Sequence, residues 1–265
     1  IGSGPTGLMA ALVAGRAGAD VILAEQAPEM GGRLLSDLSE IDGRPGPDWV
    51  AGVLAELGAM PNVRLMTRTT VTGAHDGGTY GALERVGLHL AAPGDLPREC
   101  FWRIVAGQAV LAAGALERPV AFADNDRPGV MLAGAVRGYL NRYGVLAGRR
   151  VAVFANNDSA RLTARALHRA GAEVVLIDSR TETSMLEDFR VLNGAVVTGT
   201  RGRHGLRAIS LRQGSAEFDM EADCLAVSGG WNPTLHLSCH MNGRPLWQPV
   251  LAAFVPGGDG VPGLQ

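Results

Sequence analysis

Three glycines at the start of the sequence have the spacing of a turn that binds the phosphates of a dinucleotide. They form G-x-G-x-x-G within IGSGPTG. In such a turn the first glycine permits a tight bend, the second lets the backbone approach a pyrophosphate, and the third lets helix and strand pack closely. The phosphates lie on free N–H groups at the N-terminus of the next helix, where the helix dipole is positive. The expected contacts are Gly2, Ser3, Gly4, Pro5, Thr6 and Gly7.

An acidic residue follows about 20 residues later, where a dinucleotide site needs one. It is Glu25, which closes a run of strand character over 19–24 and precedes Gln26. A carboxylate here accepts hydrogen bonds from the adenosine ribose and repels a 2′-phosphate, so NAD or FAD is favoured over NADP. The alternative is a glycine turn that serves packing alone. An alanine-rich helix predicted over 8–17, ended by Gly18, completes a β-α-β crossover.

A second crossover of the same plan lacks the glycines. Its predicted elements are a strand over 151–154, a helix over 162–170 and a strand over 173–178. The second strand ends at Asp178, but Asn156, Asn157 and Asp158 replace the glycine turn. The Asn157 side chain would obstruct a phosphate and the Asp158 charge would repel it, whereas Asp158 or Ser159 could cap the helix. We therefore expect a scaffold, or a site for something other than a dinucleotide.

The composition limits the classes of partner. The chain has 265 residues, enough for one large or two small domains, with 46% apolar and 19% charged residues and a net charge of −2. This balance favours neither nucleic acid nor an anionic membrane. The sequence has neither a signal peptide nor an apolar run of membrane-spanning length. It begins inside a motif and stops in a loop, so we expect it to be part of a longer chain.

Other chemistry-bearing residues form no convincing site. The cysteines Cys100, Cys224 and Cys239 lack C-x-x-C spacing, which predicts free thiols and a reducing, cytoplasmic location. His236, Cys239 and His240 lack a fourth ligand nearby, so no metal site is expected. Neither a nucleophile motif nor a general base stands out. The catalytic residues stay unknown, and the chain is interpreted as a cofactor holder.

Residues that follow Glu25 resemble a known superfamily. The doublet Gly31-Gly32 and the base Arg33 resemble the flavoproteins with two dinucleotide-binding domains, such as glutathione and thioredoxin reductases. This resemblance implies that Gly32 and Arg33 lie over the diphosphate, although Arg33 could instead be a solvated charge. The stretch 111–119 resembles the strand that passes beneath the cofactor. The further contacts so implied are Val71, Ala113, Gly114 and Asp259; for Asp259 the alternative is a surface turn.

The expected fold is α/β, with two Rossmann-like FAD/NAD(P)-binding units of glutathione/thioredoxin reductase type, the second inserted into the first. The first unit is predicted over 1–118 plus 230–265 and the second, glycine-poor unit over 148–229. A helical connector is predicted over 119–147.

Several longer stretches resemble a narrower family, the alpha subunits of heterotetrameric sarcosine oxidase. They are residues 116–119, 125–145, 154–160, 228–237 and 253–257. The resemblance implies a subunit that carries NAD (alternatively FAD) in the first site, within a complex with beta, gamma and delta subunits that also holds FAD and FMN. It implies oxidative demethylation of the amine sarcosine to glycine by oxygen, giving hydrogen peroxide and formaldehyde or methylene-tetrahydrofolate.

In that family the amine is oxidised at a flavin held mainly by the beta subunit, so this chain should be inactive alone. Three alternatives stay open. One is a free-standing FAD-dependent NAD(P)H oxidoreductase, and another is the alpha subunit of a related amine, opine or proline dehydrogenase. The third is a domain whose bound dinucleotide is purely structural.

Overall fold

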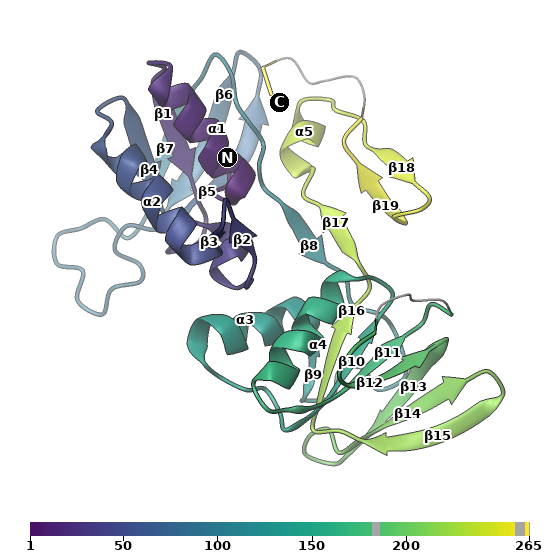
Figure 1. The fold of residues 1–265 in the computed structure, drawn as a ribbon. Coiled ribbons are helices and arrows are strands. Elements are labelled where there is room, and N and C mark those ends of the chain that lie inside the picture. The colour runs from purple at the N-terminus through teal and green to yellow at the C-terminus, as the bar shows by residue number, and fades with distance from the viewer. Residues whose placement is uncertain (182–185, 258–262, 265) are drawn as a thin grey trace. The chain divides into compact units, whose positions relative to one another are not determined.

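The chain forms two compact units, the second inserted into the first (Figure 1). This computed structural model describes residues 1–181, 186–257 and 263–264. The first unit comprises Ile1–Ala115 and Pro233–Gln265, and the second comprises Leu116–Asn232. These boundaries fall within a few residues of those predicted at 118 and 230, and the α/β fold with an inserted second unit is confirmed.

The first unit opens with the helix and the following strand of the predicted β-α-β crossover. Its elements up to Ala115 are α1 (Pro5–Arg16), β1 (Val21–Ala24), a 3₁₀ turn (Gly32–Leu35), β2 (Glu40–Ile41), β3 (Arg44–Pro45), α2 (Gly46–Ala59), β4 (Val63–Met66), β5 (Thr69–His75), β6 (Thr79–Glu84) and β7 (Cys100–Val105). β1 and β4 pair in parallel, and β5, β6 and β7 form an antiparallel sheet. Apolar side chains of α1 and α2, among them Leu8, Leu12 and Leu57, pack together with Leu23 of β1.

The described residues of the later part of the first unit form short elements. They are α5 (His236–His240), β18 (Leu246–Gln248) and β19 (Ala253–Val255). β18 and β19 pair in antiparallel fashion, and Leu237 of α5 joins a small core with Tyr80 and Leu264.

The second unit is a three-layer structure. Its elements are β9 (Val130–Leu132), α3 (Ala133–Tyr143), β10 (Arg150–Ala155), α4 (Ser159–Arg169), β11 (Glu173–Asp178), β12 (Arg190–Asn193), β13 (Ala195–Arg201), β14 (Ala208–Gln213), β15 (Ala216–Glu221) and β16 (Cys224–Ser228). The central sheet is parallel, in the order β12-β11-β10-β16-β9.

Both faces of this central sheet are covered. Alternate residues of β10 explain how: Val151 and Val153 pack with α3 and α4, whereas Ala152 and Phe154 pack with the antiparallel sheet β13-β14-β15. A parallel strand buried on both faces is a continuous apolar run, as residues 151–155 are.

The predicted connector over 119–147 is not a separate segment. Val130–Leu132 forms β9, which pairs in parallel with β16, and α3 packs on α4 through Ala133 and Val136. A three-residue strand is too short for a periodicity to reveal, so only the helix was visible in the sequence.

The inserted unit begins and ends in paired strands. β8 (Ala115–Glu117) and β17 (Trp231–Pro233) form a two-stranded sheet. The backbone of Arg118 donates to the carbonyl of Gly230 at 2.9 Å, and its carbonyl accepts from Gly229 at 2.7 Å. The incoming and outgoing chains therefore run side by side.

Candidate dinucleotide site

The glycines of the first turn have different surroundings. Gly2 has φ +92°, and a Cβ built there would lie 2.4 Å from the Ala112 carbonyl oxygen. A Cβ at Gly7 would lie 1.9 Å from the Gly2 carbonyl oxygen, whereas one at Gly4 would meet no atom within 4 Å. Gly2 and Gly7 are therefore required by packing, and Gly4 presents bare backbone to open space.

The helix behind this turn begins earlier than predicted. α1 starts at Pro5 rather than at residue 8, with Gly4 as its N-cap. Proline suits the first helical position because its missing N–H would have no partner within the helix. Gly4 has no side chain with which to cap the helix, and Pro5 and Thr6 are exposed. The N–H groups of Thr6 and Gly7 lie in the first turn, where the positive end of the helix dipole attracts an anion.

A buried polar network connects the glycine turn to the end of β1. The Ser3 backbone N–H and hydroxyl donate to Glu25 Oε2 at 2.9 and 2.6 Å. The Gly31 N–H donates to Ser3 Oγ and to the Ser3 carbonyl, each at 3.1 Å. Ser3 has no exposed surface and Glu25 is 8% exposed. Ser3 is thus a positioning residue that holds three segments together, a role its place in the motif did not reveal.

Glu25 retains capacity for a ligand. Its Oε1 accepts one hydrogen bond, from the Ala27 N–H at 2.9 Å. A carboxylate has about four acceptor positions, and Ser3 and Ala27 supply three donors to this one. One position on Oε1 can therefore accept a ribose hydroxyl, and its direction is fixed by the network.

The glycine doublet lies directly against the first turn. A Cβ at Gly32 (φ +56°) would lie 3.0 Å from the Gly4 Cα. The 3₁₀ turn starts at Gly32, so the chain passes close to the glycine turn at this point. Arg33 is half-exposed and pairs with Asp37 at 3.7 Å.

The remaining predicted contacts have different surroundings. Gln26 is exposed, and its carbonyl accepts from Arg85 Nη2 at 2.7 Å. Val71 lines a cavity beside α1, whereas Ala113 and Gly114 line a separate cavity of about 290 Å³. Asp259 lies outside the described residues. Backbone atoms of Ala112 and Ala113 lie against Gly2, and the Ala112 side chain lies against Gly7.

The glycine-poor turn of the second unit makes hydrogen bonds with other residues of the same unit. Asn157 Nδ2 donates to the carbonyl and the hydroxyl oxygen of Ser228, both at 3.1 Å. Asp158 occupies the N-cap position of α4 but makes no side-chain capping hydrogen bond, so the capping prediction was wrong for it. Ser159 is the first residue of α4, not its cap. Asp158 instead accepts from Arg180 Nη2 at 2.7 Å.

Asp178, the acid that ends β11, is fully buried between two guanidinium groups. Arg161 Nη2 donates to its Oδ2 at 3.0 Å, and Arg180 donates to Oδ1 and Oδ2 at 2.9 and 2.8 Å. Arg161 is 1% exposed and also faces Glu187 at 3.4 Å. The carboxylate that would bind a ribose is therefore occupied by the protein itself.

This arrangement predicts an acid-sensitive second unit. Burial opposes ionisation of Asp178, but its hydrogen bonds with Arg180 and the charge of Arg161 outweigh burial, so the pKa of this carboxyl is lowered. A lowered pKa contributes stability above the unfolded value of about 3.9, and this contribution is lost as pH falls below it. The free energy of unfolding of this unit should therefore be smaller at pH 3 than at pH 5. Exchange of the β10 amides, measured at increasing urea concentration at each pH, gives this free energy. Asp178→Asn should flatten this dependence, and parallel curves would contradict the assignment.

Other candidate chemistry is sparse in the described part of the chain. Over residues 1–181, 186–257 and 263–264, no group of three His, Cys, Asp or Glu side chains could hold a metal ion. Burial, with the charge of Asp223, raises the pKa of the Cys224 thiol to about 12, which makes it a poor nucleophile. None of the helices described has the length and apolar character needed to cross a membrane.

Comparison with known proteins identifies the family, although no protein-family model matches the chain. The sarcosine oxidase alpha subunit of Rhizobium meliloti is 48% identical over 265 residues, a match that covers 98% of this chain. The chain belongs to the sarcosine oxidase alpha-subunit family. A second sarcosine oxidase alpha subunit, from a Corynebacterium, is 41% identical over 97% of the chain. The chain spans only 27% and 28% of the lengths of these two relatives.

Solved structures show that the fold of this chain is a known one. L-proline dehydrogenase from P. horikoshii superposes with a TM-score of 0.76 at 20% identity, over 99% of this chain and 48% of that one. Thioredoxin reductase from Lactococcus lactis gives a TM-score of 0.72 at 16% identity, over 99% and 86%. The predicted reductase-like architecture is confirmed.

Proposed function

We propose that the first unit binds the ADP portion of NAD, with FAD as the alternative, as the dinucleotide-binding part of a sarcosine oxidase alpha subunit. The observation that carries this proposal is the 48% identity over 98% of the chain. The bare Gly4 backbone at the start of α1 and the oriented Glu25 carboxylate support the ligand class.

The whole enzyme would oxidise the N-methyl group of sarcosine. Sarcosine, oxygen and water become glycine, formaldehyde and hydrogen peroxide, so that the amine loses two electrons and oxygen gains them. When tetrahydrofolate is present, it would accept the one-carbon unit and become methylene-tetrahydrofolate, so that no formaldehyde is released. Chemistry of this kind is supplied by a flavin, which we assign mainly to a beta subunit.

The residues of this chain would bind and orient the dinucleotide. The N–H groups of Thr6 and Gly7 would hold its pyrophosphate, with Gly4 and Gly32 leaving room, and Glu25 Oε1 would accept from the ribose. Ser3 would keep that carboxylate in place. In the complete complex we expect beta, gamma and delta subunits, with FAD and FMN, in the cytoplasm. The described cysteines are free, in keeping with a reducing compartment.

The first experiment is to purify the chain, release its ligand with acid and identify it by absorbance and mass. NAD without yellow colour is the expected result. Release of FAD would favour a flavoprotein of the reductase type instead. If the chain is purified empty, titration of NAD, FAD and NADP by calorimetry gives the same discrimination.

Glu25→Gln should weaken NAD binding about tenfold, because the amide cannot accept from Ser3 and a ribose together. The preference for NAD over NADP should narrow as well, since the charge that repels the 2′-phosphate is gone. Calorimetric titration of both nucleotides measures these effects. The matched control is Glu56→Gln, an exposed glutamate on α2 that pairs with Arg16, and it should bind as the parent does. Equal affinities in the two variants would exclude Glu25 from the site.

A further inference from the structure

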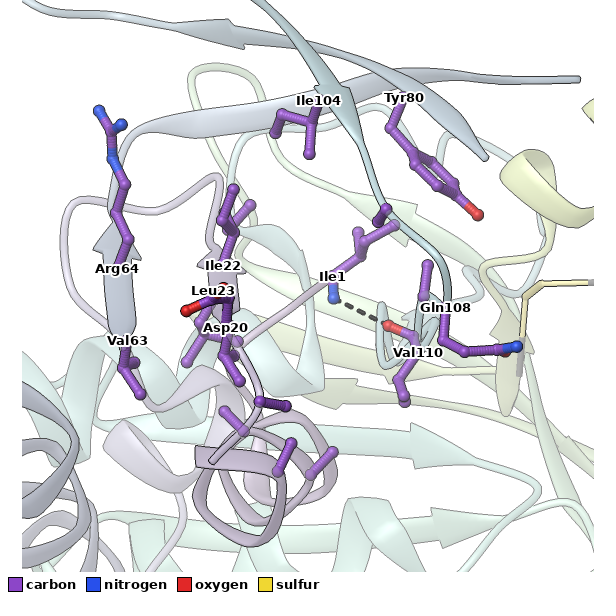
Figure 2. A pocket seen from close by; sticks show the side chains of 18 of the residues that line it. Ile1, Asp20, Ile22, Leu23, Val63, Arg64, Tyr80, Ile104, Gln108 and Val110 are labelled. Carbon is purple, nitrogen blue, oxygen red and sulfur yellow. Dashed lines mark hydrogen bonds between the residues drawn. The ribbon is translucent and has the colours of Figure 1, made fainter. Parts of the chain in front are cut away.

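The acid of the candidate site follows one of two parallel strands. β1 and β4 pair in parallel, and Figure 2 shows Ile22 of β1 beside its register partner, Arg64 of β4. The carboxyl ends of parallel strands meet at one edge of a sheet, which is where such sheets bind their ligands. Glu25 follows β1 at this edge, and residues 67–68 follow β4.

Hydrogen bonds join the two segments beyond that edge. The Thr69 N–H donates to the Glu25 carbonyl at 2.8 Å, and the Arg68 N–H donates to the Ala27 carbonyl at 2.9 Å. Arg68 has φ +52°, a conformation that residues other than glycine seldom adopt. The turn between β4 and β5 is therefore bound to the segment 25–27, which carries the acid.

A third segment reaches the same place through Arg85, which directly follows β6. Its backbone N–H donates to the Arg68 carbonyl at 3.0 Å, which continues the antiparallel pairing of β5 and β6 by one residue. Its side chain crosses to the acidic segment, where Nη2 donates to the Gln26 carbonyl at 2.7 Å. Because Arg85 is bound at both ends, its guanidinium group is held one residue along the chain from Glu25.

The guanidinium group of Arg85 retains capacity for a ligand. It has five N–H donors, and the Gln26 carbonyl accepts from one of its nitrogens. Arg85 is exposed, and it forms no ion pair with any residue that the structure describes. Its positive charge is therefore available to an anion that binds beside Glu25.

We propose that Arg85 is the residue of this site that contacts a phosphate on the 2′-oxygen of the adenosine ribose, as in NADP, and that Glu25 opposes it. This inference rests on the proposed function, in which the ribose lies at Glu25 Oε1. A 2′-phosphate then lies beside both the carboxylate and the guanidinium group. An arginine close to the acid accommodates this phosphate in NADP sites, and a guanidinium group binds phosphate through paired, charge-assisted hydrogen bonds.

The two opposite charges together set the preference for NAD over NADP. Repulsion dominates in the parent chain, because the Glu25 carboxylate holds the ribose directly whereas Arg85 reaches it from the neighbouring residue. Removal of the Glu25 charge leaves the Arg85 charge unopposed. A single substitution should therefore remove most of the discrimination against the 2′-phosphate, and Arg85 should be the reason.

The test compares two arginine substitutions in a Glu25→Gln background. Calorimetric titration gives the ratio of the Kd for NADP to the Kd for NAD. Glu25→Gln should lower this ratio about tenfold relative to the parent chain, because the repelling charge is gone. Addition of Arg85→Ala should raise the ratio again about tenfold, because the phosphate loses its guanidinium partner. The matched control is addition of Arg103→Ala, which removes an equal charge from an exposed position on β7 and should leave the ratio unchanged.

The ratio separates recognition of the phosphate from a merely structural role. If Arg85 only held the Gln26 carbonyl in place, its removal would weaken both nucleotides equally and the ratio would not change. Equal ratios in the two double variants would therefore overturn the role of Arg85 while NAD binding, and with it the proposed function, stands. A parent chain that binds neither nucleotide would overturn the proposed function and this inference together.

The parent chain offers a second comparison if Glu25→Gln lowers the yield of folded protein. NADP binding is then measured by its displacement of NAD. Arg85→Ala should raise the ratio of the two dissociation constants about tenfold, and Arg103→Ala should leave it as in the parent. Arg85→Lys, which keeps the charge without the paired donors, should give an intermediate ratio. The same ratio in all of these chains would overturn the proposal.

Discussion

A methyl group at position 7 is expected to cost the first unit about 3 kcal/mol of its free energy of unfolding. In Gly7→Ala the new Cβ would lie 1.9 Å from the Gly2 carbonyl oxygen and 3.0 Å from its carbon. Both atoms belong to a backbone that is itself fixed against Ala112 and Ala24, so no side-chain rotation relieves the overlap. Thermal unfolding and β1 amide exchange measure the loss.

The same substitution three residues earlier separates packing from binding. Gly4→Ala adds its methyl where nothing lies within 4 Å, at an ordinary φ of −64°, so we expect a stability loss of about 1 kcal/mol or less. The methyl nevertheless occupies the proposed path of the pyrophosphate, and NAD affinity should fall at least about tenfold. Unchanged NAD affinity in Gly4→Ala would contradict the proposed site, whereas an unchanged melting temperature in Gly7→Ala would contradict the packing argument.

Arg161→Met is expected to destabilise the second unit by about 2 kcal/mol, because two buried carboxylates each lose one of two guanidinium partners. Asp178 would keep Arg180, and Glu187, whose side chain is 3% exposed, would keep Arg165. Methionine fills a similar volume, so the loss reports on charge rather than on a cavity. The slowest amides of β10 give the measurement, since the two units need not unfold together.

The control for this substitution lies on the same helix. Arg169 is exposed near the end of α4, so Arg169→Met should change stability by less than about 0.5 kcal/mol. Equal losses in the two variants would mean that the ion cluster contributes no more than a surface charge.

Local patterns were enough to predict the crossover units. The glycine spacing, the alanine-rich helix and the acid at position 25 all lie within one short segment at the start of the sequence. The loss of the second turn was also readable, because Asn157 and Asp158 stand where bare backbone is needed. Each of these signals is short in sequence and depends on one element or one turn.

Long-range pairings were not readable. That Asp178 is held by Arg161 and Arg180, or that Ser3 bridges Glu25 and Gly31, depends on which side chains the folded chain brings together. Asp158 illustrates the same limit. Its residue type is typical of a helix cap, but its carboxylate accepts a hydrogen bond from Arg180 instead. Val130–Leu132 became a strand only because the edge of β16 was available.

The pairing of β8 with β17 bears on how such a protein can evolve. Residues 116–232 leave and rejoin the host through neighbouring strands, so a gene segment that encodes them can be gained, lost or exchanged as one block. The glycine-poor turn and the ion cluster of Arg161, Asp178 and Arg180 lie wholly within that block. Their residues can therefore change without any change in the residues of the glycine turn in the first unit.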